Sequence, residues 1–399
     1  MRVKKKILFV IPGLDAGGAE KSLVNLLNQI DFDSYEVDLF LFKKGGLFMK
    51  SLPLEVNILS HSETFEKFNS GLIDACSYFL SRGKIGLFIS RFQFFIKNRC
   101  YKNNAVAEQQ SWKYFSKSIP NLEKEYDAAI GFLEKSSVYF VIDIVKSKNK
   151  IGWVHTNYAT SGMDSEFDTY YFDKLNHLVT VSDECAASLR HFFSTLSNRI
   201  KVIENIISPK IINNLATVDK DNVLEDKNIN LLTIGRLSPE KGIDLAVETT
   251  FELVKRYPNL KWFVIGEGTE RIQLEQKIKE SELEDSFFLL GLKENPYPYL
   301  KQCDIYVQPS RYEGKSIAVD EAKILGKPII LTNFTTAKDQ INSGLNGLIT
   351  EMNPEAVAKA VEYLIENKNV VEDFVSNLSL EKLGTEEEIN KLYCLMINA

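Results

Sequence analysis

The sequence has few cysteines and no long apolar run. Its five cysteines are an odd number, are scattered along 399 residues and include no Cys-x-x-Cys pair. This pattern argues against a disulfide framework and a structural zinc site, and it fits a reducing compartment. No stretch has the uninterrupted apolar length of a membrane span, and the run Ile7–Ile11 stops at Pro12, too soon for a signal peptide. We expect a cytoplasmic protein, soluble or peripheral on the inner face of the plasma membrane.

Basic residues are in deficit, mainly in the second half of the chain. The whole sequence has 48 Lys and Arg against 54 Asp and Glu, a net charge of −6. Residues 207–399 carry 31 of the acidic and 22 of the basic side chains, a net charge of −9. This charge argues against nucleic acid as a partner. The length allows two domains, and the apolar fraction of 44% is that of an ordinary globular protein.

The dinucleotide fingerprint Gly-x-Gly-x-x-Gly is also missing. The apolar run Lys6–Ile11, the amphipathic segment after it and the run Tyr35–Phe42 predict the strand–helix–strand start of a doubly wound domain. In the intervening loop, Gly17-Gly18 lets the backbone approach a ligand closely. Taken alone, these glycines indicate a simple tight turn about as strongly as they indicate a ligand-binding loop. Because the fingerprint is missing, an oxidoreductase with a Rossmann domain is a weak alternative. A nicotinamide absorbance test would decide it.

Histidine is scarce, with four in the chain. His155 follows the predicted strand Lys150–Val154, at the kind of strand end where α/β domains gather their sites. His61 and His191 have no polar cluster around them in the sequence. The segment Asp31-Phe32-Asp33 has the spacing of a metal-binding aspartate pair, but it precedes the second strand and is interpreted as a turn. We expect no metal site.

A second series of strands and helices starts at Ile229–Ile234. It follows the polar stretch 208–228, which we interpret as a linker between an N-terminal domain at 1–206 and a C-terminal domain at 207–383. The strand leads into the loop Gly235–Gly242, where Arg236 and Lys241 are five residues apart. Basic side chains at this spacing can converge on one phosphate pair. For either residue taken singly, a surface ion pair is the alternative.

The stretch 304–333 reads as strand, loop, helix and strand. Glu313 lies in the loop, and Glu321 lies in the helix that follows. Such a helix start offers backbone N–H groups and the positive end of the dipole to an anion; its residues are Gly314, Lys315, Ser316 and Ile317. The two carboxylates suit sugar or ribose hydroxyls, which donate hydrogen bonds to them. Gly-Lys-Ser also mimics the end of a P-loop, but Pro309 stands where that motif requires glycine.

This stretch has Glu313 and Glu321 with seven residues between them, Ala322 after the second glutamate, and Gly326-Lys327-Pro328 at the helix end. Together these features resemble retaining glycosyltransferases of family 4. The string Gly-Arg-Leu…Lys-Gly at 235–242 is similar to the diphosphate loop of that family. The resemblance is strong over 229–350, moderate over 5–30 and weak over 50–150. It implies the GT-B fold, an α/β architecture in which two Rossmann-like domains face each other across a cleft. The polar run after Glu313 departs from the small or apolar residues usual there, and leaves the sugar preference open.

The resemblance also implies an activity. A sugar would move from a nucleotide-diphosphate donor, expected to be a UDP-sugar, to a glycan or lipid-linked acceptor with retention, in surface polysaccharide or glycoconjugate synthesis. No metal or other cofactor would be needed, and a final helix at 384–397 would pack back on the first domain. The implied roles are diphosphate binding by Arg236, Lys241 and the backbone at 314–317, approach to the donor by Gly17 and Gly18, sugar contacts by Glu313 and His155, and ribose binding by Glu321.

Two other functions compete with this one. A non-catalytic nucleotide-sugar-binding subunit of a hetero-oligomer is the main alternative, and a turnover assay on the isolated chain discriminates. Paired carboxylates also suggest a glycoside hydrolase, for which the basic loop at 235–242 would serve no purpose.

The segment 82–102 lacks acidic residues altogether. It has six basic residues among many Phe, Leu and Ile side chains. Cationic amphipathic helices of this composition can lie on anionic membrane surfaces. The alternative, that the aromatic residues are core and the bases a solvated face, is equally compatible with the sequence. The membrane interpretation makes Arg91, Lys97 and Arg99 the bases that face lipid.

Overall fold

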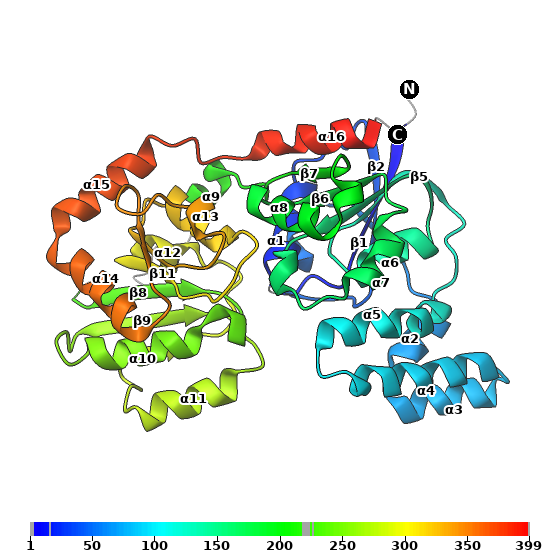
Figure 1. The fold of residues 1–399 in the computed structure, drawn as a ribbon, viewed down its shortest axis with the longest axis horizontal. Coiled ribbons are helices and arrows are strands. Elements are labelled where there is room, and N and C mark those ends of the chain that lie inside the picture. The colour runs from blue at the N-terminus through cyan, green and yellow to red at the C-terminus, as the bar shows by residue number, and fades with distance from the viewer. Residues whose placement is uncertain (1–3, 16, 218–223, 226, 398–399) are drawn as a thin grey trace. The chain divides into compact units, whose positions relative to one another are not determined.

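The computed structural model describes residues 4–15, 17–217, 224–225 and 227–397. The chain divides into two compact units. The first comprises Met1–Asp15, Leu23–Glu204 and Glu388–Ala399, and the second comprises Ala16–Ser22 and Asn205–Glu387. Each unit is built on one parallel sheet with helices packed on it (Figure 1). The predicted α/β class with two Rossmann-like domains is confirmed.

The sheet of the first unit has the order β3-β2-β1-β4-β5-β6-β7. All its described pairs are parallel, and Ile7 of β1 lies opposite both Val37 of β2 and Ala128 of β4. The central strands are nearly continuous apolar runs because helices cover both faces of such a sheet. The strands are β1 (Lys5–Ile11), β2 (Tyr35–Leu41), β3 (Asn57–Ile58), β4 (Glu125–Gly131), β5 (Lys146–Val154), β6 (His177–Thr180) and β7 (Ile200–Val202).

Helices connect and cover these strands. They are α1 (Gly18–Leu27), α2 (Glu63–Asn69), α3 (Leu72–Ser81), α4 (Ile85–Cys100), α5 (Asn104–Phe115), α6 (Ser136–Asp143), α7 (Ser165–Phe172), α8 (Asp183–Phe192) and α16 (Ile389–Ile397). Ser182 caps α8, since its hydroxyl accepts a hydrogen bond from the Cys185 N–H at 3.2 Å. In α16, the Tyr393 ring stacks on that of Tyr35 with centroids 5.1 Å apart. The final helix therefore packs on the first sheet.

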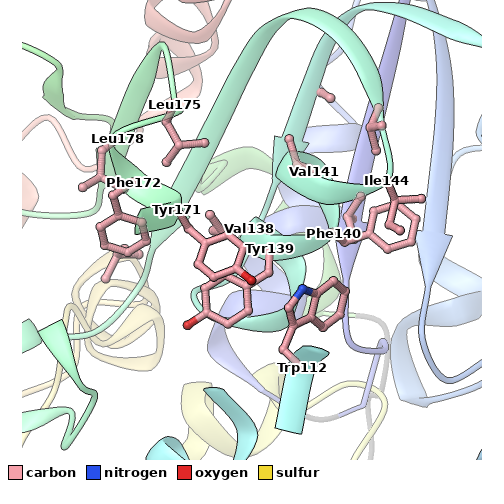
Figure 2. Close-up of a cluster of buried hydrophobic side chains, with 14 of the residues drawn as sticks. Trp112, Val138, Tyr139, Phe140, Val141, Ile144, Tyr171, Phe172, Leu175 and Leu178 are labelled. Carbon is pink, nitrogen blue, oxygen red and sulfur yellow. The ribbon is translucent and has the colours of Figure 1, made fainter. Parts of the chain in front are cut away.

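The region between β3 and β4 is a helical layer, α2–α5. Trp112 of α5 is buried beside Tyr139 of α6, with ring centroids 5.9 Å apart (Figure 2). Phe140 of α6 in turn contacts Phe40 of β2 at 4.4 Å. This aromatic core attaches α5 to the sheet, whereas α3 and α4 pack beyond α5 on its outer side (Figure 1).

The sheet of the second unit has the order β10-β9-β8-β11-β12-β13, again with parallel pairs. Its strands are β8 (Ile229–Ile234), β9 (Leu260–Ile265), β10 (Phe287–Leu289), β11 (Ile305–Gln308), β12 (Ile329–Thr332) and β13 (Leu348–Thr350). Its helices are α9 (Pro209–Leu215), α10 (Ile243–Leu253), α11 (Arg271–Glu280), α12 (Tyr297–Gln302), α13 (Ile317–Ile324), α14 (Pro354–Glu366) and α15 (Lys368–Ser379).

The structure bears on two interpretations of the sequence, those of the stretch 208–228 and of the segment 31–33. The polar stretch 208–228, interpreted as a linker, begins with the helix α9, whose first residue Pro209 suits a helix start because its missing N–H would be unpaired there anyway. Residues 218–223 and 226 of that stretch lie outside the described residues. The segment 31–33 is a turn as expected, because the Asp33 N–H donates to Asp31 Oδ1 at 3.0 Å.

Candidate active site

In the second sheet the strand order reverses between β8 and β11. Ligands of open parallel sheets bind beyond the carboxyl ends of the strands at such a switch point. The two loops that leave this point are 235–242 after β8 and 309–316 after β11. They hold Arg236, Lys241 and Glu313, three residues expected from the sequence to be functional. The fold therefore brings the two predicted motifs together at the position where a ligand is expected.

Lys241 and Glu313 form an ion pair. The Lys241 Nζ lies 2.6 Å and 2.7 Å from the two oxygens of the Glu313 carboxylate. Ser310 also donates its hydroxyl to Glu313 Oε1 at 2.8 Å, and Gln308 donates its amide at 3.3 Å. The carboxylate is therefore fixed from several sides at the end of β11. Glu313 oriented in this way suits hydrogen bonds from sugar hydroxyls, which sequence reasoning expected of it.

Arg236 is exposed and makes no ion pair or hydrogen bond to the described residues through its guanidinium. Its backbone, by contrast, is held firmly. The Gly235 N–H donates to the Ile265 carbonyl and the Leu237 N–H donates to the Glu267 carbonyl, both at 3.0 Å. A loop fixed in this way with an unpaired guanidinium can bind an anion without first breaking a contact.

Gly242 and Arg311 clamp the two loops together. Gly242 has φ of +65°, and a Cβ there would lie 2.0 Å from the Pro309 carbonyl oxygen, so the close approach requires glycine. The Arg311 guanidinium binds both oxygens of Asp244 at 2.8 Å and 2.7 Å. Its backbone N–H donates to the Glu240 carbonyl at 2.7 Å. Sequence reasoning missed Arg311, because nothing in its local pattern indicates a partner 67 residues away.

The start of α13 is partly occupied by a side chain. Gln340 accepts from the Ser316 N–H at 2.9 Å and donates to the Ser316 carbonyl at 2.7 Å. The Ser316 amide is therefore engaged in this structure. Ile317 is the first helical residue, and the side chain of the N-cap residue Ser316 makes no capping hydrogen bond, so the amides after Ser316 remain for an anion at the positive end of the dipole. Gly314 is buried, and Lys315 Nζ lies 4.0 Å from Asp320 Oδ2.

Glu321 lies deeper, with 1% of its side chain exposed. Its Oε1 accepts a hydrogen bond from the Tyr297 hydroxyl at 2.9 Å and lies 2.5 Å from Lys21 Nζ. Burial opposes the charge of Lys21, but the Glu321 carboxylate outweighs it and raises the pKa of Lys21. Glu321 Oε2 is buried and has no hydrogen-bond partner among the described residues. A buried carboxylate oxygen without a donor is an acceptor that a ligand hydroxyl would satisfy.

Lys21 belongs to the segment 16–22, which groups with the second unit. Sequence reasoning named the neighbouring glycines instead. Gly17 precedes α1, and a Cβ on it would lie 2.0 Å from the flexible Glu20 carboxylate, whereas a Cβ on Gly18 would meet nothing within 4 Å. One weak feature of the sequence does set Lys21 apart. It is a basic residue in the first turn of α1, where the helix dipole disfavours a positive charge, so a negatively charged partner is expected.

His155 follows β5 in the first unit. Its ring lies 4.8 Å from the Phe132 ring and 5.9 Å from the Trp153 ring, nearly parallel to the latter. Burial lowers the pKa of His155 to about 3. Because the imidazole is then neutral at physiological pH, it can form hydrogen bonds with a sugar but carries no charge for phosphate.

Among the described residues, no group of three or more His, Cys, Asp or Glu side chains is placed to hold a metal ion. No helix within the described part of the chain is both long and apolar enough to cross a membrane.

Solved structures with the same architecture identify the fold as GT-B. TarM of Staphylococcus aureus, a mutant crystallised with fondaparinux, α-GlcNAc-glycerol and UDP, aligns with a TM-score of 0.69 and 17% identity over 99% of this chain and 100% of its own. Anabaena HepE crystallised with UDP-glucose aligns with a TM-score of 0.70 and 14% identity over 99% of this chain and 100% of its own.

Residues 216–379 match the model of the family described as glycosyl transferases group 1. An uncharacterized glycosyltransferase of Haemophilus influenzae is 31% identical over 47% of this chain and 54% of its own length. The poly(ribitol-phosphate) α-N-acetylglucosaminyltransferase of Staphylococcus aureus is 29% identical over 40% of this chain and 33% of its own. The chain thus spans about half or less of these curated relatives.

Proposed function

We propose that this chain is a glycosyltransferase. It transfers a sugar from a nucleotide-diphosphate donor, a UDP-sugar, to a glycan or lipid-linked acceptor with retention of the anomeric configuration, in surface polysaccharide or glycoconjugate synthesis. The observation that carries the proposal is the switch-point cluster in the family-matched unit, where the Lys241–Glu313 ion pair lies between loops that also present Arg236. UDP in the TarM structure and UDP-glucose in the HepE structure support the choice of donor.

In the proposed reaction the bond between the anomeric carbon and the diphosphate oxygen breaks. A bond to the acceptor oxygen forms on the same face, and the acceptor proton passes to the departing phosphate. Arg236, Lys241 and the amides at the start of α13 stabilise the charge that develops on the diphosphate. Glu313 and His155 orient the sugar, and Glu321 binds the ribose.

The proposal is tested by incubating the purified chain with a panel of nucleotide sugars. A thermal-shift screen comes first, because a ligand at 100 times its dissociation constant adds about 2.7 kcal/mol to the free energy of unfolding. Turnover is then measured with the stabilising donor. Donor binding without turnover on the isolated chain, with any acceptor offered, would favour the alternative of a non-catalytic subunit.

The proposal places cationic side chains and amides where some other transferases place a metal ion. We therefore expect activity to persist in EDTA, because Arg236 and Lys241 supply the positive charge. The measurement is turnover before and after chelation. A loss of activity that manganese or magnesium restores would contradict this assignment, and calcium serves as the control for non-specific ionic effects.

We further propose that α4 docks on an anionic lipid surface, which would place a lipid-linked acceptor beside the first unit. Ile85, Ile89, Phe92 and Ile96 recur at helical spacing and are between 41% and 61% exposed. Arg82, Lys84, Arg99 and Lys102 are exposed around this helix, and no acidic residue lies between 82 and 102. Apolar side chains that enter the lipid and flanking bases that meet its phosphates fit such a surface.

The structure corrects one part of the membrane interpretation. Arg91, expected from the sequence to face lipid, is buried. Its guanidinium donates to the Ser70 carbonyl at 3.0 Å and lies 5.6 Å from the Phe68 and Phe94 rings. Arg91 attaches α4 to the layer beneath, so its reversal would disturb folding and it is unsuited to a binding test.

We expect the purified protein to sediment with vesicles containing phosphatidylglycerol and to dissociate as salt rises, because exposed charges are screened. Ile89→Ser with Phe92→Ser, and separately Lys97→Glu with Arg99→Glu, should each lower binding about tenfold or more, since each base adds about 1 kcal/mol of attraction. Ile272→Ser with Lys279→Glu on α11 is the matched control, because both residues are exposed.

Two outcomes would sink the docking proposal. One is a wild-type protein that stays in the supernatant at low salt. The other is a chain that self-associates through this face, seen in analytical ultracentrifugation as an oligomer that the Ile89→Ser and Phe92→Ser changes dissociate.

A further inference from the structure

The first sheet has its own switch point, between β1 and β4. Ligand sites of open parallel sheets lie at this position. The loop after β4 runs from Phe132 to Lys135, and its one acidic residue is Glu134. Sequence reasoning gave this loop no role, because a single glutamate after an apolar strand has no local signature.

Glu134 reaches the loop of the neighbouring strand. Its Oε2 accepts a hydrogen bond from the backbone N–H of His155, which follows β5, at 3.1 Å. Burial raises the pKa of Glu134, although the charge of Lys135 acts in the opposite direction. Lys135 is itself paired with Glu108 at 2.6 Å. A carboxyl group desolvated at the ligand end of a sheet is typical of functional sites.

The His155 side chain is held on two sides, by the rings of Phe132 and Trp153. The hydrogen bond from its backbone N–H to Glu134 adds a third contact, and all three come from residues of the first unit. The His155 Nε2 is buried and has no hydrogen-bond partner among the described residues. A buried polar nitrogen without a partner is costly and calls for an explanation, of which a bound group is one.

We propose that Glu134 is a positioning residue, which fixes the backbone of His155 so that the imidazole Nε2 meets a hydroxyl group of a sugar. Phe132 links Glu134 to His155, because it lies in the same loop as Glu134 and its ring contacts the His155 ring. Glu134 itself acts through His155 and needs no contact with the ligand. The sugar ligand rests on the proposed function, whereas the coupling between Glu134 and His155 does not.

The coupling is tested without any substrate. The chain has four histidines, so a spectrum of protein labelled with ¹⁵N-histidine is readily assigned, with His155→Gln identifying the signal of interest. We expect the His155 ring to stay neutral between pH 5 and 8. Glu134→Ala should shift or broaden its signal, and Glu134→Gln should not, because the amide oxygen still accepts the N–H. Glu108→Gln is the control, because it removes the charge that pairs with Lys135 and keeps an oxygen to accept from the Ser136 hydroxyl, without touching the Glu134–His155 contact.

The functional half is tested by kinetics on the donor that the wild type uses. Glu134→Ala should lower kcat about tenfold with an unchanged donor KM, and Glu134→Gln should stay within about threefold of wild type. The double variant Glu134→Ala with His155→Ala should be no slower than His155→Ala alone, because both changes remove the same interaction, that of the His155 imidazole with the sugar.

Each result decides a different question. An unchanged His155 signal in Glu134→Ala, or equal effects of Ala and Gln at position 134, would overturn the positioning role. Additive kinetic losses would overturn it as well. A wild type without turnover, but with the expected spectra, would instead count against the proposed function and leave the coupling standing.

Discussion

Replacing Lys241 by alanine is expected to lower turnover by about 100-fold or more, because one preorganised charge contact to the transition state is worth about 3 kcal/mol. The change removes positive charge from the switch point of the second sheet and leaves Glu313 without its cation. The measurement is kcat with the donor that stabilises the wild type. A rate near that of wild type would exclude Lys241 from the phosphate site.

The ion pair changes what this variant does to folding. Sequence reasoning alone expects little effect on stability from Lys241→Ala. In the structure the Glu313 side chain is 8% exposed, and once Lys241 is lost its remaining side-chain donors among the described residues are the neutral Ser310 and Gln308. We therefore expect the free energy of unfolding to fall by about 2 kcal/mol, somewhat less than for a fully buried pair.

Two further variants separate stability from catalysis. Lys241→Met with Glu313→Gln removes both charges together, so stability should recover while turnover stays low. Arg236→Ala is the cleaner probe of phosphate binding, because its guanidinium has no partner among the described residues to leave unpaired. It should lower turnover with an unchanged melting temperature.

The sequence predicts the fold well because the signals of a parallel sheet are local. Runs such as Lys6–Ile11 and Ile229–Ile234 are apolar along their whole length, as strands covered on both faces must be. The strand-to-helix loops that carry Arg236, Lys241 and Glu313 could be located from these runs. Their convergence also follows, since loops at the carboxyl ends of adjacent parallel strands share one edge.

The residues that hold the predicted ones could not be located in this way. Gln340 contacts Ser316 from 24 positions away, and Arg311 contacts Asp244 from 67 positions away. Such partners are chosen by tertiary packing, which leaves no periodicity in the sequence. Arg91 is a second example of a position that the sequence does not reveal. Its place in a basic segment indicates a surface residue, whereas the position of α4 on the layer beneath buries it.

Replacing Glu321 by glutamine is expected to weaken UDP binding by about 10- to 100-fold, because a hydrogen bond to a charged acceptor contributes about 1.5–3 kcal/mol. The Oε1 of Glu321 is already engaged by Lys21 and Tyr297, and its buried Oε2 has no partner. An amide in place of Oε2 would turn the acceptor into a donor or force the side chain to flip, which would break the contact with Lys21.

The ribose assignment itself needs a comparison of ligands. Wild type should bind UDP more tightly than 2′,3′-dideoxy-UDP, and Glu321→Gln should bind the two almost equally, as measured by calorimetry. Tyr297→Phe is the matched control. It removes one hydrogen bond to Oε1 at 2.9 Å while the charge of the carboxylate and its Oε2 remain, so it should keep most of the preference for the ribose hydroxyls. If Glu321→Gln discriminated between the two ligands as strongly as wild type does, Oε2 would not be the ribose acceptor. The Lys21–Glu321–Tyr297 cluster would then serve only to hold α13 in place.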